Sequence, residues 1–197
     1  QERLPKSKTG FALTTAKARA KIYYDANDAL VIKRSAELFA RDIQMVTGQK
    51  PELIQKRERA KALVIVGTIE KNQWICELAQ KGKIDIRPLQ GAWERYLIQT
   101  VDNPSPGVAK ALVIAGSDRR GAAYGLFSIS EMMGVSPWYW WGDVPVKTHK
   151  ALYVDAPPTY SKTPSVKYRG IFLNDEDWGL KPWAAKTFEK ERGNIGP

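Results

Sequence analysis

The sequence predicts an α/β domain in which a mixed sheet is layered with amphipathic helices. Two runs, residues 62–67 and 111–115, are continuously apolar, which is typical of strands buried on both faces. Ahead of the first run, apolar residues recur at spacings of three and four along residues 32–46, which indicates one face of a helix. Strands that alternate with such helices form layered α/β domains.

The first half of the chain predicts two strand–helix units. Residues 20–25 are rich in β-forming side chains and alternate in polarity, so we expect a strand there. The helix that follows has Gly48 as a C-cap and Pro51 beyond it as a stop. The strand at 62–67 and a short helix that ends near Gly82 form the second unit.

The next part predicts two strands in succession. Residues 84–86 are a short strand candidate, and residues 96–101 are a stronger one. The Pro- and Gly-rich residues 102–107 then predict a turn before the apolar run at 111–115. Two strands joined by a turn indicate an antiparallel member within the mixed sheet.

A third helix is expected after the second apolar run. Ser117 or Asp118 supplies its N-cap, and Gly134 ends it. Its apolar face includes Tyr124 and Phe127. The predicted element order is therefore β-α-β-α-β-β-α.

The chain changes character beyond Gly134. Five prolines between residues 137 and 164 indicate a connector. Residues 166–173 then predict one more strand, which polar and aromatic residues follow. Such a strand carries apolar side chains that need partners, so we expect the residues after about 165 to lean on the domain sheet or to self-associate between molecules.

Composition excludes several kinds of site. The single cysteine, Cys76, excludes an internal disulfide framework and a cysteine zinc site, and the single histidine, His149, excludes most histidine metal cages. We interpret Cys76 as an inert buried thiol and His149 as a surface residue, and we predict no metal and no cofactor. Every apolar run is far shorter than the roughly 20 residues that span a bilayer, so no membrane segment is predicted.

The first residue bears on localisation. Gln1 is not an initiator methionine, which is expected of a secreted or periplasmic protein whose signal peptide has been removed. An engineered boundary gives the same start.

The charge balance is strongly basic. The chain has 31 Lys and Arg against 21 Asp and Glu, a formal net charge of +10, with basic residues gathered in residues 3–21 and 50–61. Neither group alternates with aromatic side chains as a platform for single-stranded nucleic acid does. No nucleic-acid-binding motif is present. We therefore interpret the charge as a solvated basic surface and predict no nucleic-acid partner.

Two segments are candidates for ligand contact. The motif Gly-Ser-Asp-Arg-Arg-Gly at residues 116–121 joins a buried strand to a helix, where backbone N–H groups with Arg119 and Arg120 can hold an anion. The alternative is an N-cap with two surface arginines. Residues 138–141 are all aromatic, and Trp140 and Trp141 offer flat faces to sugar rings or plug a domain interface.

Three acids follow the last predicted strand. Asp175, Glu176 and Asp177 repel one another, which is costly unless they are exposed or engaged by a partner. A carboxylate cluster at the end of a sheet or barrel strand is where α/β active sites gather. An acidic loop that caps the next helix is the alternative.

The segment Tyr-Arg-Gly-Ile-Phe-Leu-Asn-Asp-Glu at residues 168–176 resembles the start of the catalytic barrel in glycoside hydrolase family 115, the xylan α-glucuronidases. Other segments agree with this family in order and spacing: residues 67–69, 82–86, 91–94, 116–121 and 134–141. The resemblance covers nearly the whole chain.

The resemblance implies a division of the chain and a parent activity. Residues 1–160 are expected to form an N-terminal accessory α/β domain, and residues 161–197 a linker and the beginning of a (β/α)₈ barrel. The family removes α-1,2-linked glucuronic acid or its 4-O-methyl ether from xylan with inversion. The match places Asn174 and Asp175 as sugar contacts, with the general acid and base on later barrel strands.

The chain is expected to be a non-catalytic fragment of such a hydrolase. A barrel takes roughly 250 residues, and only about 30 follow Ser165. An inverting glycosidase needs two carboxyls about 6.5–9.5 Å apart, whereas the acids at 175–177 are neighbours on one loop. In the parent, Arg119 and Arg120 are expected to hold the uronate carboxylate of glucuronoxylan, with Trp140 and Trp141 beside it. A stand-alone module that binds acidic polysaccharide is the alternative.

Overall fold

The computed structural model describes residues 10–139, 142–172, 174 and 178–187. The chain divides into two compact units, Gln1–Pro164 and Ser165–Pro197. Within the described residues, no helix is both long and apolar enough to cross a membrane.

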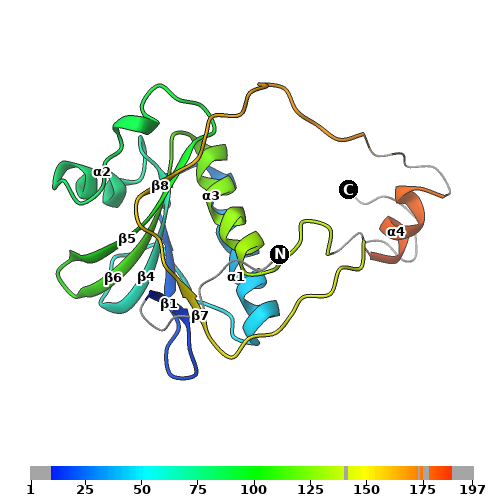
Figure 1. Ribbon diagram of the computed structural model, residues 1–197, viewed down its shortest axis with the longest axis horizontal. Coiled ribbons are helices and arrows are strands. Elements are labelled where there is room, and N and C mark those ends of the chain that lie inside the picture. Colours follow the sequence, from blue (N-terminus) through cyan, green and yellow to red (C-terminus); the bar gives the residue numbers. More distant parts are fainter. Residues whose placement is uncertain (1–9, 140–141, 173, 175–177, 188–197) are drawn as a thin grey trace. The chain divides into compact units, whose positions relative to one another are not determined.

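The first unit is built on a six-stranded mixed sheet (Figure 1). Four strands run parallel, β5 is antiparallel to β6, and β8 is antiparallel to β5. In spatial order the strands are β3 (Leu53–Ile54), β2 (Lys21–Tyr24), β4 (Ala60–Thr68), β6 (Val108–Gly116), β5 (Tyr96–Ser105) and β8 (Thr159–Tyr160). A separate pair, β1 (Phe11–Thr14) and β7 (Leu152–Val154), is antiparallel.

Helices cover both faces of this sheet, which confirms the predicted layered α/β class. α1 (Leu30–Thr47) and α3 (Arg119–Met132) lie side by side on one face (Figure 1). On the other face lie α2 (Gln73–Gln80) and the short 3₁₀ helix η1 (Arg87–Leu89).

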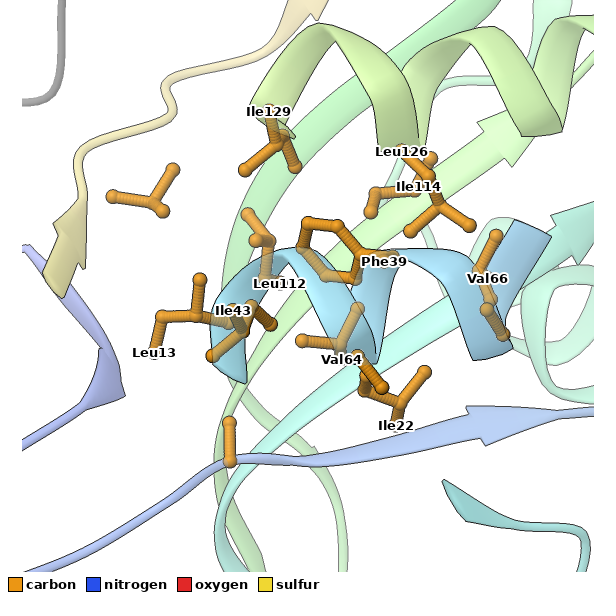
Figure 2. Close-up of a cluster of buried hydrophobic side chains, with 14 of the residues drawn as sticks. Leu13, Ile22, Phe39, Ile43, Val64, Val66, Leu112, Ile114, Leu126 and Ile129 are labelled. Atoms are coloured by element: carbon orange, nitrogen blue, oxygen red, sulfur yellow. The ribbon is translucent and has the colours of Figure 1, made fainter. Parts of the chain in front are cut away.

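The central strands are buried on both faces, as their continuous apolar runs predict. Along β4, Val64 and Val66 point into the core beneath α1 and α3, whereas Leu63 and Ile65 point into the core beneath α2. Phe39 of α1 lies at the centre of the first core, between the strand side chains and α3 (Figure 2).

The sequence predicts two of the caps that bound these helices, Gly48 after α1 and Asp118 before α3. Gly48 has φ 73°, and its N–H donates to the Gln44 carbonyl, which closes α1. Asn72 caps α2 and Asp118 caps α3, each by accepting two backbone N–H groups.

Some sequence expectations differ from the structure of the first unit. Residues 84–86 form no strand; the Asp85 carboxylate instead binds the backbone N–H and guanidinium of Arg87 and holds a turn into η1. Tyr124 and Phe127 lie at the margin of α3, 38% and 37% exposed, rather than on its buried face. The proline-rich connector contributes the short strands β7 and β8.

The second unit has one helix among its described residues, α4 (Leu180–Thr187). Residues 166–172 are not paired as a strand, so the strand predicted at 166–173 is wrong for them; Leu173 lies outside the described residues. A strand needs a hydrogen-bonded neighbour, and the described part of this unit supplies none.

Candidate functional site

The carboxyl ends of the parallel strands meet at one edge of the sheet, where α/β proteins gather functional side chains. β2 ends at Tyr24, β4 at Thr68 and β6 at Gly116, and β5 begins at the same edge because Tyr96 pairs with Gly116. Two polar clusters occupy the loops of this edge.

The first cluster ties the loop after β2 to the end of β4. The Asp28 carboxylate accepts from the Thr68 N–H at 2.8 Å and from the Thr68 hydroxyl at 3.1 Å. Asn72 donates to the Val66 carbonyl at 3.0 Å while it caps α2. A Cβ at Gly67 would lie 2.4 Å from the Asn72 amide nitrogen, so only glycine fits between these groups. This dense hydrogen bonding indicates a role in stability.

The second cluster contains the predicted arginine loop. Asp118 accepts from the N–H groups of Arg120 and Gly121 at 2.9 and 2.8 Å, and its other oxygen accepts from the Glu94 N–H at 2.7 Å. The first-turn N–H groups considered for anion binding therefore already have a carboxylate acceptor. The N-cap alternative accounts for this part of the motif.

The glycines of this motif serve close packing. A Cβ at Gly121 would lie 2.1 Å from the Arg95 carbonyl oxygen, and a Cβ at Gly116 would lie 2.2 Å from the Ala122 nitrogen. The strand, the helix and the segment before β5 meet there without room for a side chain.

The two predicted arginines differ in their surroundings. Arg120 donates to the Glu94 carboxylate at 3.0 Å, and the Glu94 side chain is only 6% exposed. The Arg119 side chain is exposed and has no hydrogen bond or ion pair within the described part of the chain. Of the two, only Arg119 thus presents an uncommitted guanidinium to solvent.

Sequence reasoning missed two neighbours of this loop. Glu94 has a positive φ of 55°, and it presents its carboxylate to Arg120. Arg95 reaches the carbonyls of Pro88 and Ser161, each at 2.8 Å. The segment at residues 91–94 carries part of the family resemblance, and this was the available signal.

The predicted tryptophans, Trp140 and Trp141, lie outside the described residues. The residue before them, Tyr139, accepts a hydrogen bond from Arg41 of α1, whose guanidinium carbon lies 5.8 Å from the centre of the tyrosine ring. Both residues line a groove of about 490 Å³ between α1, α3 and residues 135–139.

Asp42 is buried in this groove between the helices. Burial raises the pKa of its carboxyl, and the neighbouring Ser130 hydroxyl and Arg41 counteract this effect in part. Tyr124 and Phe127 also line the groove.

In the second unit, Asn174 is described and Asp175 is not. The Asn174 carbonyl accepts from the Leu180 N–H at 2.7 Å, which joins the predicted sugar-contact position to the start of α4. Glu176 and Asp177 lie outside the described residues as well.

No group of three His, Cys, Asp or Glu side chains that could hold a metal ion occurs within the described ranges. The Cys76 thiol is half-buried and donates to the Ile69 carbonyl, and burial raises its pKa. His149 is also half-buried, and its backbone N–H donates to the Val46 carbonyl at 2.8 Å. It is therefore packed against the end of α1 rather than freely exposed.

Comparison with known proteins gives a family. The model of glycosyl hydrolase family 115 matches residues 161–196. The solved structure of BtGH115A, a family GH115 4-O-methyl-α-glucuronidase with specificity for decorated arabinogalactans, matches with 35% sequence identity and a TM-score of 0.75 over 95% of this chain. The chain belongs to glycosyl hydrolase family 115.

The family 115 chain spans 23% of the length of that glucuronidase. A β-hexosaminidase mutant from Streptomyces plicatus is also similar, with 11% identity, a TM-score of 0.45, and coverage of 81% of this chain and 24% of that one. A similarity at this level supports no argument about fold or function. The comparison with curated proteins gave no match.

The matched range decides which predicted residues lie inside the family model. Asn174 and Asp175 fall within residues 161–196, whereas Arg119, Arg120, Trp140 and Trp141 lie before this range.

Proposed function

We propose that this chain is the N-terminal part of a secreted or periplasmic α-glucuronidase that removes α-1,2-linked glucuronic acid, or its 4-O-methyl ether, from a decorated plant polysaccharide with inversion. One observation carries the proposal: 35% identity over 95% of the chain to a 4-O-methyl-α-glucuronidase. Xylan is the polymer expected from the family resemblance. Decorated arabinogalactan is a second candidate, because the similar glucuronidase is named for its specificity toward it.

The α/β domain is proposed to be non-catalytic. An inverting glycosidase places a general acid and a general base about 6.5–9.5 Å apart across the bond. At the carboxyl edge, Asp28 and Asp118 accept backbone N–H groups, and Glu94 is paired with Arg120. These carboxylates are committed to holding loops, which supports a structural role.

Asp42 does not fit the catalytic role either. A raised pKa is one property of a general acid, but Asp42 is 6% exposed beneath side chains of the helix groove. Substrate contact in the parent is instead proposed for Asn174 and Asp175. Independently of these two residues, Arg119 is proposed as a contact for a uronate carboxylate.

The test compares two polypeptides on two polymers. The 197-residue chain and the longer product of its gene are incubated with 4-O-methylglucuronoxylan and with glucuronidated arabinogalactan, and released uronic acid is followed by ¹H NMR. We expect the 197-residue chain to release no uronic acid. We expect the longer protein to release it initially as the β-anomer, because inversion at an α-linkage gives that anomer. Release by the short chain would show that the domain is catalytic, and failure of the longer protein on both polymers would overturn the glucuronidase assignment.

A further inference from the structure

A second concave surface lies at the opposite edge of the sheet, where β4 and β6 begin. It has a volume of about 770 Å³ and is formed by residues 59–61, by Lys81 and Lys83 after α2, and by the hairpin residues 103–109 between β5 and β6. We call this surface the basic groove. β4 has nine residues, so the basic groove lies about 30 Å from the edge that carries Asp118.

The charged side chains that line the basic groove are all cationic. Arg59, Lys61, Lys81 and Lys83 line it, and no acidic residue does. The side chains of Arg59 and Lys61 make no ion pair or hydrogen bond with any residue that the structure describes. Because like charges gathered in a concave surface raise the local concentration of counter-ions, the groove favours an anionic ligand.

The nearby acids compensate only part of this charge. Glu77 binds Arg57 through both carboxylate oxygens, at 2.7 and 2.8 Å, and lies 4.0 Å from Lys81. Asp102 is paired with Lys110 at 3.3 Å.

The groove is held in shape before any ligand arrives. The Ala60 N–H donates to the Gly107 carbonyl at 3.0 Å, which ties the hairpin to the start of β4. Lys83 donates to the Asn103 carbonyl at 2.6 Å. Gly107 has φ 85°, and a Cβ there would lie 2.9 Å from Cγ of Arg59, so the arginine stem packs over the glycine. A preformed site binds with a smaller loss of conformational entropy.

The chemistry of the lining selects among anions. Pro104, Pro106 and Val108 supply apolar surface between the cations, and no aromatic side chain lines the groove. Single-stranded nucleic acid is held mainly by stacking on aromatic rings, which this surface does not offer. Apolar faces flanked by cations suit pyranose rings that carry a carboxylate.

We propose that the basic groove binds the uronic acid substituents of an acidic polysaccharide, with Arg59 and Lys61 as the carboxylate contacts. The inference rests on the proposed function, because that function supplies a polymer with uronic acids along its length. The groove then holds the polymer at a second place on the protein.

The test uses the 197-residue chain and two oligosaccharides that differ in one charge. The chain is titrated in separate experiments with aldotetraouronic acid, which is xylotriose with one 4-O-methylglucuronic acid, and with xylotetraose, and both titrations are followed by ¹⁵N-HSQC NMR. We expect the charged sugar to shift the amide signals of Lys83, Gly107 and Val108, and xylotetraose to leave them unchanged. The double variant Arg59→Gln/Lys61→Gln is expected to weaken binding about fivefold or more.

Lys17→Gln/Arg19→Gln, in a second basic surface of the first unit, is the matched control and is expected to bind like the parent chain. Equal binding of xylotetraose, an equal loss in both double variants, or tighter binding of oligo-dT at the same amides would overturn the inference. Binding is measured without hydrolysis, so a longer protein that fails to release uronic acid while the groove binds refutes the proposed function alone. If the longer protein releases uronic acid but the charged sugar does not bind at the basic groove, this inference alone is refuted.

Discussion

At the scale of single residues, the motif at 116–121 shows how a pattern that suggests anion binding is explained by packing. Gly121 packs its α-carbon against the Arg95 carbonyl, and Asp118 satisfies the helix N-terminus. The backbone oxygen at Arg95 cannot swing aside as the tip of a flexible side chain can. The glycine is therefore required by the approach of two backbones.

Gly121→Ala is expected to lower the free energy of unfolding by about 1–3 kcal/mol, because the new methyl group overlaps backbone atoms. Urea unfolding followed by tryptophan fluorescence measures the change. Arg119→Ala, two positions away on the exposed side of the same loop, is the control and is expected to stay within about 0.5 kcal/mol of the parent. Equal stability of both variants would contradict the packing argument.

Asp42 gives the stability a pH dependence. Burial raises its pKa in the folded state above the ordinary value of 3.8. Between the two values the folded state binds more protons than the unfolded state, so the contribution of this residue to stability falls as pH rises through that window. Above the window the folded state carries a buried, unfavourable negative charge.

Asp42→Asn removes this charge, so the free energy of unfolding of the variant relative to the parent is expected to be higher at pH 7 than at pH 4. Urea unfolding at both pH values measures it. Glu70→Gln, at an exposed position, controls for the loss of one negative charge. A relative stability of Asp42→Asn that is the same at both pH values would argue against the desolvated carboxylate.

At the scale of elements, the sequence predicts the helices and strands that carry a long hydrophobic pattern in their own residues. α1 has 18 residues with one apolar face, and β4 and β6 have apolar runs that the structure buries on both faces. β3 and β8 have two residues each and β7 has three. Such short segments become strands only because a neighbour pairs with them, and this information is not in their own residues.

The surroundings of the candidate site were less predictable for the same reason. Arg120 and Arg95 are visible in the sequence as charges, but their partners, Glu94 and Ser161, lie 26 and 66 residues away along the chain. The antiparallel pairing of β5 with β6 and the return of the chain at β8 bring them together. Cap chemistry is local, and Asp118 was predicted as one of two candidate caps.

The strand β8 is expected to be the last element that the first unit needs for its stability. The Tyr160 hydroxyl donates to the Asp85 carbonyl at 2.6 Å, and Ser161 exchanges hydrogen bonds with Tyr96 at 2.9 and 3.0 Å. A chain that ends at residue 164 keeps these bonds, whereas one that ends at residue 158 loses them together with the Arg95 contact to Ser161.

The shorter chain is expected to be less stable by about 3 kcal/mol, since each lost hydrogen bond contributes about 0.5–1.5 kcal/mol. It also leaves the edge of β5 unpaired, which favours aggregation. Thermal unfolding of the two truncated chains measures the difference. Equal melting temperatures would show that β8 does not belong to the cooperative unit.

At the scale of the whole molecule, the two units differ in how far their apolar side chains are buried. The first unit buries its strand side chains in two cores, one on each face of the sheet. In the second unit Tyr168, Ile171 and Phe172 are 88%, 68% and 92% exposed, and Trp178 is 83% exposed. Several large apolar side chains that are exposed this close together in the sequence indicate a surface that binds another surface.

The 197-residue chain is therefore expected to self-associate through residues 168–172, because burying each large apolar side chain contributes about 1.5–3 kcal/mol. Sedimentation velocity over a range of concentrations is expected to show an increasing sedimentation coefficient for the full chain and a constant one for residues 1–164. Ile171→Ser/Phe172→Ser is expected to abolish the increase, whereas Lys162→Ser, at an exposed position nearby, is expected to retain it. A full chain that stays monomeric at every concentration would show that these side chains make no contact between molecules.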